Sequence, residues 1–178
     1  MGGTEPIRFN LRSGQEVAIR PIEPSDEEEL RAFVRRLSPE SRRFRFFAPI
    51  QELSDGFAYR LTHVDAVTRD ALVATLPGET AIRAVGRFDR VDDESVEVAF
   101  TVEDSMQGQG LATELLWLLA ERARDFGYRK LVAVVLPENR KMLSVFHDCG
   151  LPCVTRWEEG NVRVELELGE GMVQPRFR

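Results

Sequence analysis

The sequence has few cysteines, no long apolar run and no excess of positive charge. Its 178 residues include two cysteines, Cys149 and Cys153. This number fits a reducing compartment, and two cysteines alone cannot form a metal site. No apolar stretch approaches the length that spans a bilayer, and the first residues lack the basic and apolar regions of a signal peptide. We therefore expect a cytoplasmic protein with no metal ion and no membrane partner.

The charge balance also limits the class of partner. The 24 Lys and Arg residues and the 30 Asp and Glu residues give a net charge of -6. A general nucleic-acid binder is usually basic, so we expect no nucleic-acid partner. The apolar share of 43% and the charged share of 30% are ordinary for a globular domain. We expect one domain over residues 15–168, with a lead-in at 1–14 and a tail at 169–178.

Apolar periodicity and turn residues predict a succession of strands and helices. Strands are expected at 15–22, 71–76, 81–91, 95–102, 131–136, 154–157 and 162–168. Helices are expected after Ser25, after Ser38, and at 54–62, 113–126 and 139–149. The short connections among the strands between 71 and 102 indicate antiparallel pairing. The pattern predicts an α/β (α+β) fold: a mixed, mostly antiparallel sheet of six to seven strands, flanked by helices.

A glycine-rich turn joins the strand that ends at Val102 to the helix that begins near Thr113. Its sequence is Gln107-Gly108-Gln109-Gly110-Leu111-Ala112. Two glycines allow close approach of the backbone to a ligand, and the first amides of the helix can bind an anion. The spacing fits neither G-x-x-x-x-G-K-[ST] nor G-x-G-x-x-G. The turn therefore predicts a phosphate site of another class, or an ordinary turn with no ligand.

The pattern Val102-x-x-x-x-Gln107-x-x-Gly110-x-Ala112 resembles the coenzyme A signature of the GCN5-related N-acetyltransferase (GNAT) family. The order of strands and helices is also that of the family. The resemblance implies a GNAT-like fold and acetyl-CoA as cosubstrate. It implies that the loop amides bind the pyrophosphate, with the Thr113 hydroxyl as an added donor. The implied cofactor-binding residues are Phe100, Thr101, Val102, Gln107, Gly108, Gln109, Gly110, Leu111, Ala112, Thr113 and Asn139.

Two of these assignments have a simpler alternative. Phe100 to Val102 would hold the pantetheine arm where their strand splays from the next, and the amide of Phe100 or Val102 would polarise the thioester carbonyl. They would otherwise be ordinary ladder residues. Asn139 would bond the arm, and it is also well suited to cap a helix. Both roles are compatible.

Further stretches resemble bacterial Pat-type protein lysine acetyltransferases. They are Ile19-Arg20-Pro21-Ile22, Leu37-Ser38-Pro39-Glu40-Ser41, Arg45-Phe46-Phe47 and Leu61-Thr62-His63-Val64-Asp65. The resemblance implies a protein lysine as the acceptor. Such enzymes often carry a nucleotide-binding or acyl-CoA-synthetase-like domain, for which these 178 residues leave no room. A small-molecule amine as acceptor, or a non-enzymatic acetyl-CoA-binding regulatory module, remain alternatives, and the sequence does not give the oligomeric state.

Glu97 is the candidate general base for direct transfer in a ternary complex. It lies in an otherwise apolar strand, where partial desolvation would favour proton uptake, and it matches the glutamate that serves as the base in Pat-type enzymes. The alternative is a carboxylate that faces solvent. Many family members also have a tyrosine that protonates the departing thiolate, and Phe146 stands at the matching position. Arg35, Arg36, Arg42, Arg43 and Arg45 are interpreted as a solvated basic face with ion pairs, and Cys149 as a structural residue. His63 would either line the acceptor site or have a hydrogen-bonded structural role.

Overall fold

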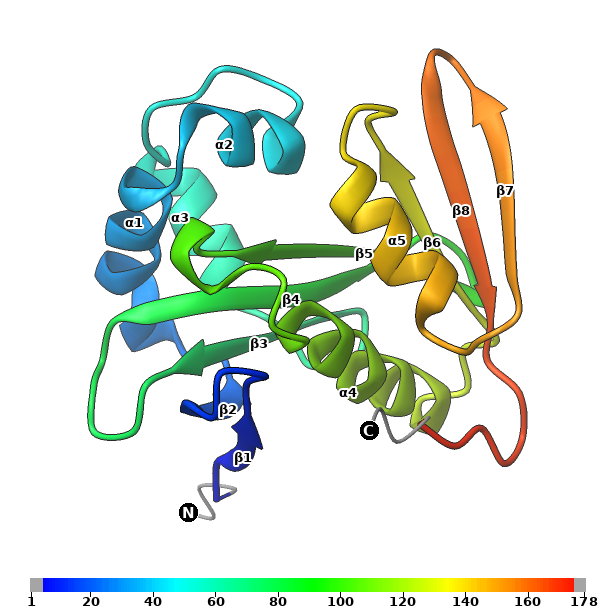
Figure 1. Cartoon of the computed structure of the whole chain (residues 1–178), viewed down its shortest axis with the longest axis horizontal. Helices are drawn as coiled ribbons and strands as arrows, with labels where there is room; N and C mark the ends of the chain where they lie inside the picture. The colour runs from blue at the N-terminus through cyan, green and yellow to red at the C-terminus, as the bar shows by residue number, and fades with distance from the viewer. Residues whose placement is uncertain (1–4, 175–178) are drawn as a thin grey trace.

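The computed structural model describes residues 5–174 and contains one eight-stranded sheet (Figure 1). The strand order is β1-β2-β3-β4-β5-β6-β8-β7, and only the β5–β6 pair is parallel. The strands are β1 (Ile7–Asn10), β2 (Glu16–Pro21), β3 (Arg69–Thr75), β4 (Ile82–Arg90), β5 (Ser95–Val102), β6 (Lys130–Val135), β7 (Cys153–Glu158) and β8 (Asn161–Glu167). The α-helices are α1 (Glu27–Arg36), α2 (Pro39–Phe46), α3 (Asp55–Thr62), α4 (Leu111–Asp125) and α5 (Arg140–Asp148). Among the described residues, no helix is long and apolar enough to cross a membrane.

The sheet has one strand more than the six to seven that the sequence predicted. The extra strand is β1, which lies in the segment 1–14 that was predicted as a lead-in. It pairs antiparallel with β2, from Ile7 with Ile19 to Asn10 with Glu16. Three of its four residues are exposed. An edge strand held by backbone pairing rather than by burial leaves no apolar alternation to detect.

The residues predicted as a tail are also partly ordered against the domain. The Gln174 side chain donates a hydrogen bond to Glu114 on α4 (2.7 Å). Residues 1–4 of the lead-in and 175–178 of the tail lie outside the described part of the chain.

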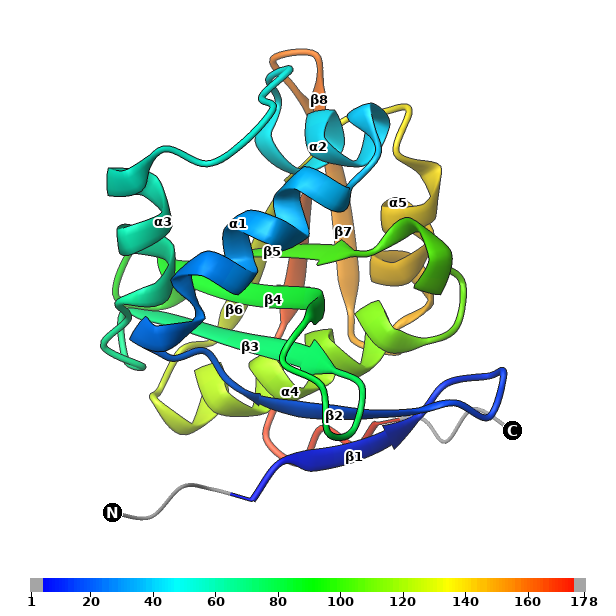
Figure 2. The ribbon, with the colours of Figure 1, turned by 90° about the vertical axis from the view of Figure 1, so that its left-hand side faces the viewer.

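Helices cover the sheet on both faces (Figure 2). α4 and α5 pack on one face and α1 to α3 on the other, so the core has two layers. β3 contributes to both, because Leu72 and Ala74 face α4 while Ala71 and Val73 face the opposite layer. This burial on both faces explains why the middle of β3, residues 71–74, is apolar.

The parallel pair β5–β6 opens after three residues. Its register runs from Ser95 with Lys130 to Glu97 with Val132. β5 continues to Val102 along β4, while β6 continues to Val135 along β8. Beyond Glu97, no described residue of β5 is paired with β6. The two strands therefore diverge, and the divergence creates the site described next.

Candidate active site

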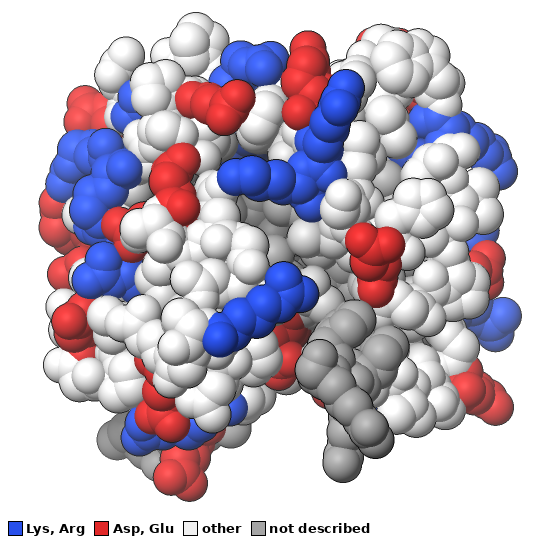
Figure 3. All heavy atoms as spheres, viewed as in Figure 1, with Lys and Arg blue, Asp and Glu red and all other residues white. Residues whose placement is uncertain are grey.

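A cleft of about 1430 Å³ occupies the gap between β5 and β6. One end of it is formed by Gln107–Thr113 and is called here the loop end. The other end contains Phe44, Arg45, Glu97 and Val134 and is called the Glu97 end. Figure 3 shows a hollow near the centre of this face, with basic side chains beside it.

The glycine-rich turn has the geometry of an anion site. Gly108 and Gly110 have φ angles of 72° and 91°, a left-handed conformation that favours glycine. Gly110 is the N-cap of α4 and offers no side chain to the free amides that follow it. The amides at the start of α4 therefore lie at the cleft with the positive end of the helix dipole behind them.

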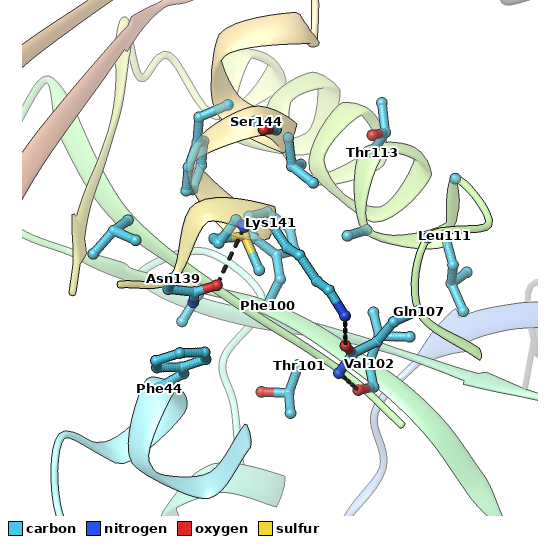
Figure 4. Close-up of a pocket in the computed structure, with 18 of the residues that line it drawn as sticks. Phe44, Phe100, Thr101, Val102, Gln107, Leu111, Thr113, Asn139, Lys141 and Ser144 are labelled. Atoms are coloured by element: carbon cyan, nitrogen blue, oxygen red, sulfur yellow. Dashed lines mark hydrogen bonds between the residues drawn. The ribbon is translucent and has the colours of Figure 1, made fainter. Parts of the chain in front are cut away.

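The two glutamines of the turn hold it in place. Gln107 Nε2 donates to the carbonyl of Val102 (3.1 Å) and to Ser41 Oγ (3.3 Å), and Gln107 Oε1 accepts from Lys141 Nζ (3.2 Å; Figure 4). Gln109 bonds the segment between β1 and β2: its carbonyl accepts from the amide of Arg12, and its Oε1 from the amide of Ser13. Both side chains thus tie the loop to other elements.

Of the remaining loop residues, one packs in the core and two line the cleft. The Leu111 side chain is buried in the core, although the residue borders the cleft. Ala112 and Thr113 are half-buried and line the cleft, so the Thr113 hydroxyl is placed at the loop end. These positions fit a phosphate held by backbone amides with one hydroxyl beside them.

The edge of β5 offers backbone groups to the gap. The amide of Glu103 donates to the carbonyl of Arg83 on β4 (2.8 Å). Because alternate residues direct their backbone groups to opposite edges of a strand, those of Val102 and Phe100 point toward β6. Thr101 lies near Phe44 of α2 (Figure 4). Phe100 and Val102 therefore have ladder groups available to an extended ligand.

Asn139 and Phe146 border the cleft from α5. Asn139 is the N-cap of that helix and accepts a hydrogen bond from the amide of Met142 (3.2 Å). Its capping role is thereby shown, and it still lines the cleft. Phe146 is buried, with its ring in a T-shaped contact with Phe100 at 6.0 Å. It brings no proton donor to the cleft.

Glu97 lies where the β5–β6 pairing ends, and it lines the cleft. The expectation of a partly desolvated carboxylate is wrong, because the residue is exposed. The helices that pack on this face leave its side chain accessible, although Arg45 of α2 lies close to it. Two acidic residues just after β5 are engaged elsewhere: Glu103 forms ion pairs with Arg36 and Arg83, and Asp104 accepts from the hydroxyls of Ser38 and Ser41.

Arg45 is a cleft residue that the interpretation of a solvated basic face did not anticipate. It is half-buried, and its guanidinium lies 4.9 Å from the centre of the Phe46 ring. Burial and the neighbouring Arg87 lower the pKa of Arg45 to about 10, against the attraction of Asp89 and Glu97. The group remains a cation at neutral pH. The run Arg45-Phe46-Phe47 was a signal in the sequence, but only the fold places it beside Glu97.

His63 and Cys149 have structural roles, which was the expectation for Cys149 and one of the two alternatives for His63. His63 Nδ1 lies 2.9 Å from the carbonyl oxygen of Tyr59, and the two rings stack. Cys149 is fully buried, and its Sγ donates to the carbonyl of Phe146 (3.1 Å). Burial raises the pKa of the Cys149 thiol, which disfavours the reactive thiolate.

The hairpin β1–β2 supplies cleft residues that the sequence did not reveal. Phe9, Asn10 and Arg12 line the loop end. Phe9 lies under the turn, since a Cβ on Gly110 would stand 3.7 Å from its ring. These residues follow no motif, and a short exposed strand gives little sign of what it covers.

Comparison with known proteins identifies this arrangement. The sequence of residues 16–152 matches the family model of the acetyltransferase (GNAT) domain. An acetyltransferase of Pseudomonas aeruginosa is 36% identical over 136 residues, which cover 75% of this chain and 73% of that relative. The acetyltransferase Pat of Mycolicibacterium smegmatis is 28% identical over 165 residues, and the match covers 92% of this chain but 49% of that relative.

A solved structure gives the same result. The GNAT domain of the S. lividans PAT protein superposes with a TM-score of 0.85 at 40% identity, covering 92% of this chain and 97% of that domain. The diverging strands and the uncapped helix amides fit the extended thioester that GNAT enzymes use. The chain belongs to the GNAT family of acetyltransferases, and acetyl-CoA is its cosubstrate.

Proposed function

We propose that the chain transfers the acetyl group of acetyl-CoA to a lysine side chain of a protein, directly within a ternary complex. Glu97 acts as the general base. The observation that carries the proposal is the open surroundings of Glu97. A small amine calls for a closed acidic pocket, whereas a protein surface calls for an open groove beside the base.

The sheet beside Glu97 is available to a large acceptor. The register places Val132 beside Glu97, and Glu165 of β8 beside Val132. Next to them on the same face lie Val134 and Arg163, which are half-buried, as is Glu165. α1 and α2 pack over β4 and β5. The half of the face formed by β6 and β8 thus offers a mixed apolar and charged surface next to the reacting position.

Different residues of the cleft have different roles in the proposed reaction. Acetyl-CoA supplies an activated acyl group. Glu97 accepts a proton from the acceptor ammonium, so that the amine nitrogen can form the new C–N bond as the C–S bond breaks. The amide of Phe100 or Val102 donates to the carbonyl oxygen as negative charge develops there. Because Phe146 stands where many family members have a tyrosine acid, the coenzyme A thiolate leaves without a proton from the chain. The second proton of the attacking nitrogen passes to water or to the departing thiolate as the amide forms.

The stretches that resemble Pat-type protein lysine acetyltransferases also support a protein acceptor. The chain covers about half of the Mycolicibacterium relative, so the regulation and partners of that whole protein are not transferred.

The test is a thiol-release assay with purified protein acceptors and a panel of small amines. The matched control for each protein is the same protein with its lysines reductively dimethylated, which removes acceptor capacity but keeps the fold. We expect release with unmodified proteins and little release with dimethylated ones. A polyamine, amino acid or aminoglycoside that outperforms every protein would replace the proposed acceptor class. Binding of acetyl-CoA without release for any acceptor would indicate a regulatory module.

A further inference from the structure

We propose that Arg12 and Lys141 form a cationic clamp on the diphosphate of acetyl-CoA. Arg12 belongs to the segment between β1 and β2, and Lys141 to the first turn of α5. Both line the cleft, and each bonds a residue of the glycine-rich turn, Arg12 to Gly108 and Lys141 to Gln107. The proposal concerns the donor only and is independent of the acceptor class.

Arg12 is fixed to the turn by its own backbone and side chain. Its amide donates to the carbonyl of Gln109 (3.2 Å), and its guanidinium Nη1 donates to the carbonyl of Gly108 (3.3 Å). Gly108 and the amides that follow Gly110 form the anion site. The guanidinium therefore stands beside the groups that would receive a phosphate, with donors left after its single bond to Gly108.

Lys141 reaches the same turn from a different element, α5. Figure 4 shows its side chain extending from α5 toward Gln107, where Nζ donates to Oε1 (3.2 Å). Gln107 is itself held by Val102 and Ser41, so the end point of the lysine is fixed. The exposed ammonium can turn from this neutral acceptor to an anionic one at small cost.

The electrostatics of the chain make such a pair useful. The chain carries a net charge of -6, and its cosubstrate is strongly anionic. The uncapped start of α4 offers only about half an elementary charge. Glu114 in the first turn of α4 also lines this end, with its carboxylate bonded by Gln174. Two local cations offset Glu114 and attract the donor to the loop end.

The test measures the affinity of Arg12→Gln, Lys141→Ala and the double variant for coenzyme A by calorimetry. Gln at position 12 keeps a donor for the Gly108 carbonyl but removes the charge, so a purely structural role would be preserved. Each single change should weaken binding by about fivefold and the double change by about 25-fold. The effect should shrink as salt concentration rises.

Two control variants replace an arginine and a lysine that lie outside the cleft. Arg8 lies on the same hairpin, pairs with Glu16 and does not line the cleft; Lys130, the other lysine of the chain, lies on β6 outside the cleft. Arg8→Gln and Lys130→Ala should leave the affinity within twofold of the original protein.

Two coenzyme A fragments identify the contact. Binding of S-acetylpantetheine, which lacks the phosphates, should be unchanged by the clamp variants when followed by NMR titration. Binding of 3′-dephospho-coenzyme A should still be weakened. Equal losses for S-acetylpantetheine and coenzyme A, or no loss for either, would overturn the clamp. If the variants bound coenzyme A more weakly but bound 3′-dephospho-coenzyme A as tightly as the original protein does, the cations would contact the 3′-phosphate. That result would overturn the diphosphate assignment.

Discussion

The two ends of the cleft are built from different chemical groups. At the loop end, the features that fit the donor are mainly backbone: two left-handed glycines, the free amides of α4 and the unpaired edge of β5. At the Glu97 end, the features are side chains from separate elements: Phe44 and Arg45 from α2, Glu97 from β5 and Val134 from β6. A backbone site depends on conformation, so many sequences can build it, whereas a side-chain site changes with each substitution.

This difference explains why the loop end can be detected in the sequence and the Glu97 end cannot. The loop end has a short sequence signature, because the required φ angles strongly favour glycine. The Glu97 end has no comparable signature, since its residues are brought together by the sheet and by α2. The same contrast suggests that the donor is common to the family while the acceptor varies. The following predictions, from the largest effect to the smallest, test how separate the two ends are.

Glu97→Gln should give the largest effect and should act on the acceptor step alone. Loss of the base should lower kcat by roughly 10²- to 10⁴-fold, while the Kd for acetyl-CoA stays within twofold. Steady-state kinetics and calorimetry measure the two quantities. The control is Asp89→Asn, which changes the cross-strand neighbour of Glu97 outside the cleft. Retention of more than a tenth of kcat would remove Glu97 from the role of base.

Gly86→Ala should disturb both ends, because β4 supports β5 and packs against α4. A Cβ at this position would lie 3.1 Å from Leu115 Cβ and 3.1 Å from Phe100 Cδ1. Such overpacking costs about 1–3 kcal/mol, to be measured by denaturant unfolding. The control Gly56→Ala lies in α3 with open space around it and should be neutral or stabilising. If Gly86→Ala left the free energy of unfolding unchanged, α4 would have to move away from the sheet without cost.

Gly110→Ala should damage the loop end alone. An alanine at a φ of 91° costs about 1–2 kcal/mol, and relief of that strain would turn the α4 amides away from the ligand. We expect the Kd for acetyl-CoA to rise about tenfold. Gly78→Ala imposes similar strain (φ 79°) in the β3–β4 turn, outside the cleft, and should lower stability without changing affinity. Equal affinities in the two variants would contradict a conformational requirement at Gly110.

Asp104→Asn should give the smallest effect, one that depends on pH. Burial alone would raise the pKa of Asp104, but hydrogen bonds from Ser38 and Ser41 outweigh it and the pKa is lowered. A depressed folded-state pKa stabilises the fold above the unfolded value, near 3.9, and the gain is lost as pH falls through the folded value. The original protein should be more stable than the variant by about 1 kcal/mol or less at pH 7. The stabilities of the two proteins should converge as the pH falls through the depressed folded-state pKa of Asp104. A difference that stayed constant below that pKa would rule out ionisation as its source.

Much of the architecture could be predicted because it depends on local patterns. The seven predicted strands correspond to β2 through β8. In β2 to β6 and β8 the apolar residues follow the burial that the sheet imposes, whereas the almost fully exposed β7 was predicted from the hairpin turn at 158–161. The Asn139 cap is equally local, because the side chain bonds an amide three residues later. The strand β1 was missed because its stabilisation comes from β2, and its four residues carry no pattern of burial.

The sequence by itself determined the family, the acetyl donor and the position of the glycine-rich turn, because left-handed glycines before an uncapped helix require particular residues at fixed spacing. Only the tertiary structure decided the exposure of Glu97, the placement of Arg45 beside it, and the packing of Arg12 and Lys141 against the loop. Those features depend on where β5 and β6 separate and on which distant segments fill the edges of the gap. Such long-range arrangements leave no periodic trace in the chain.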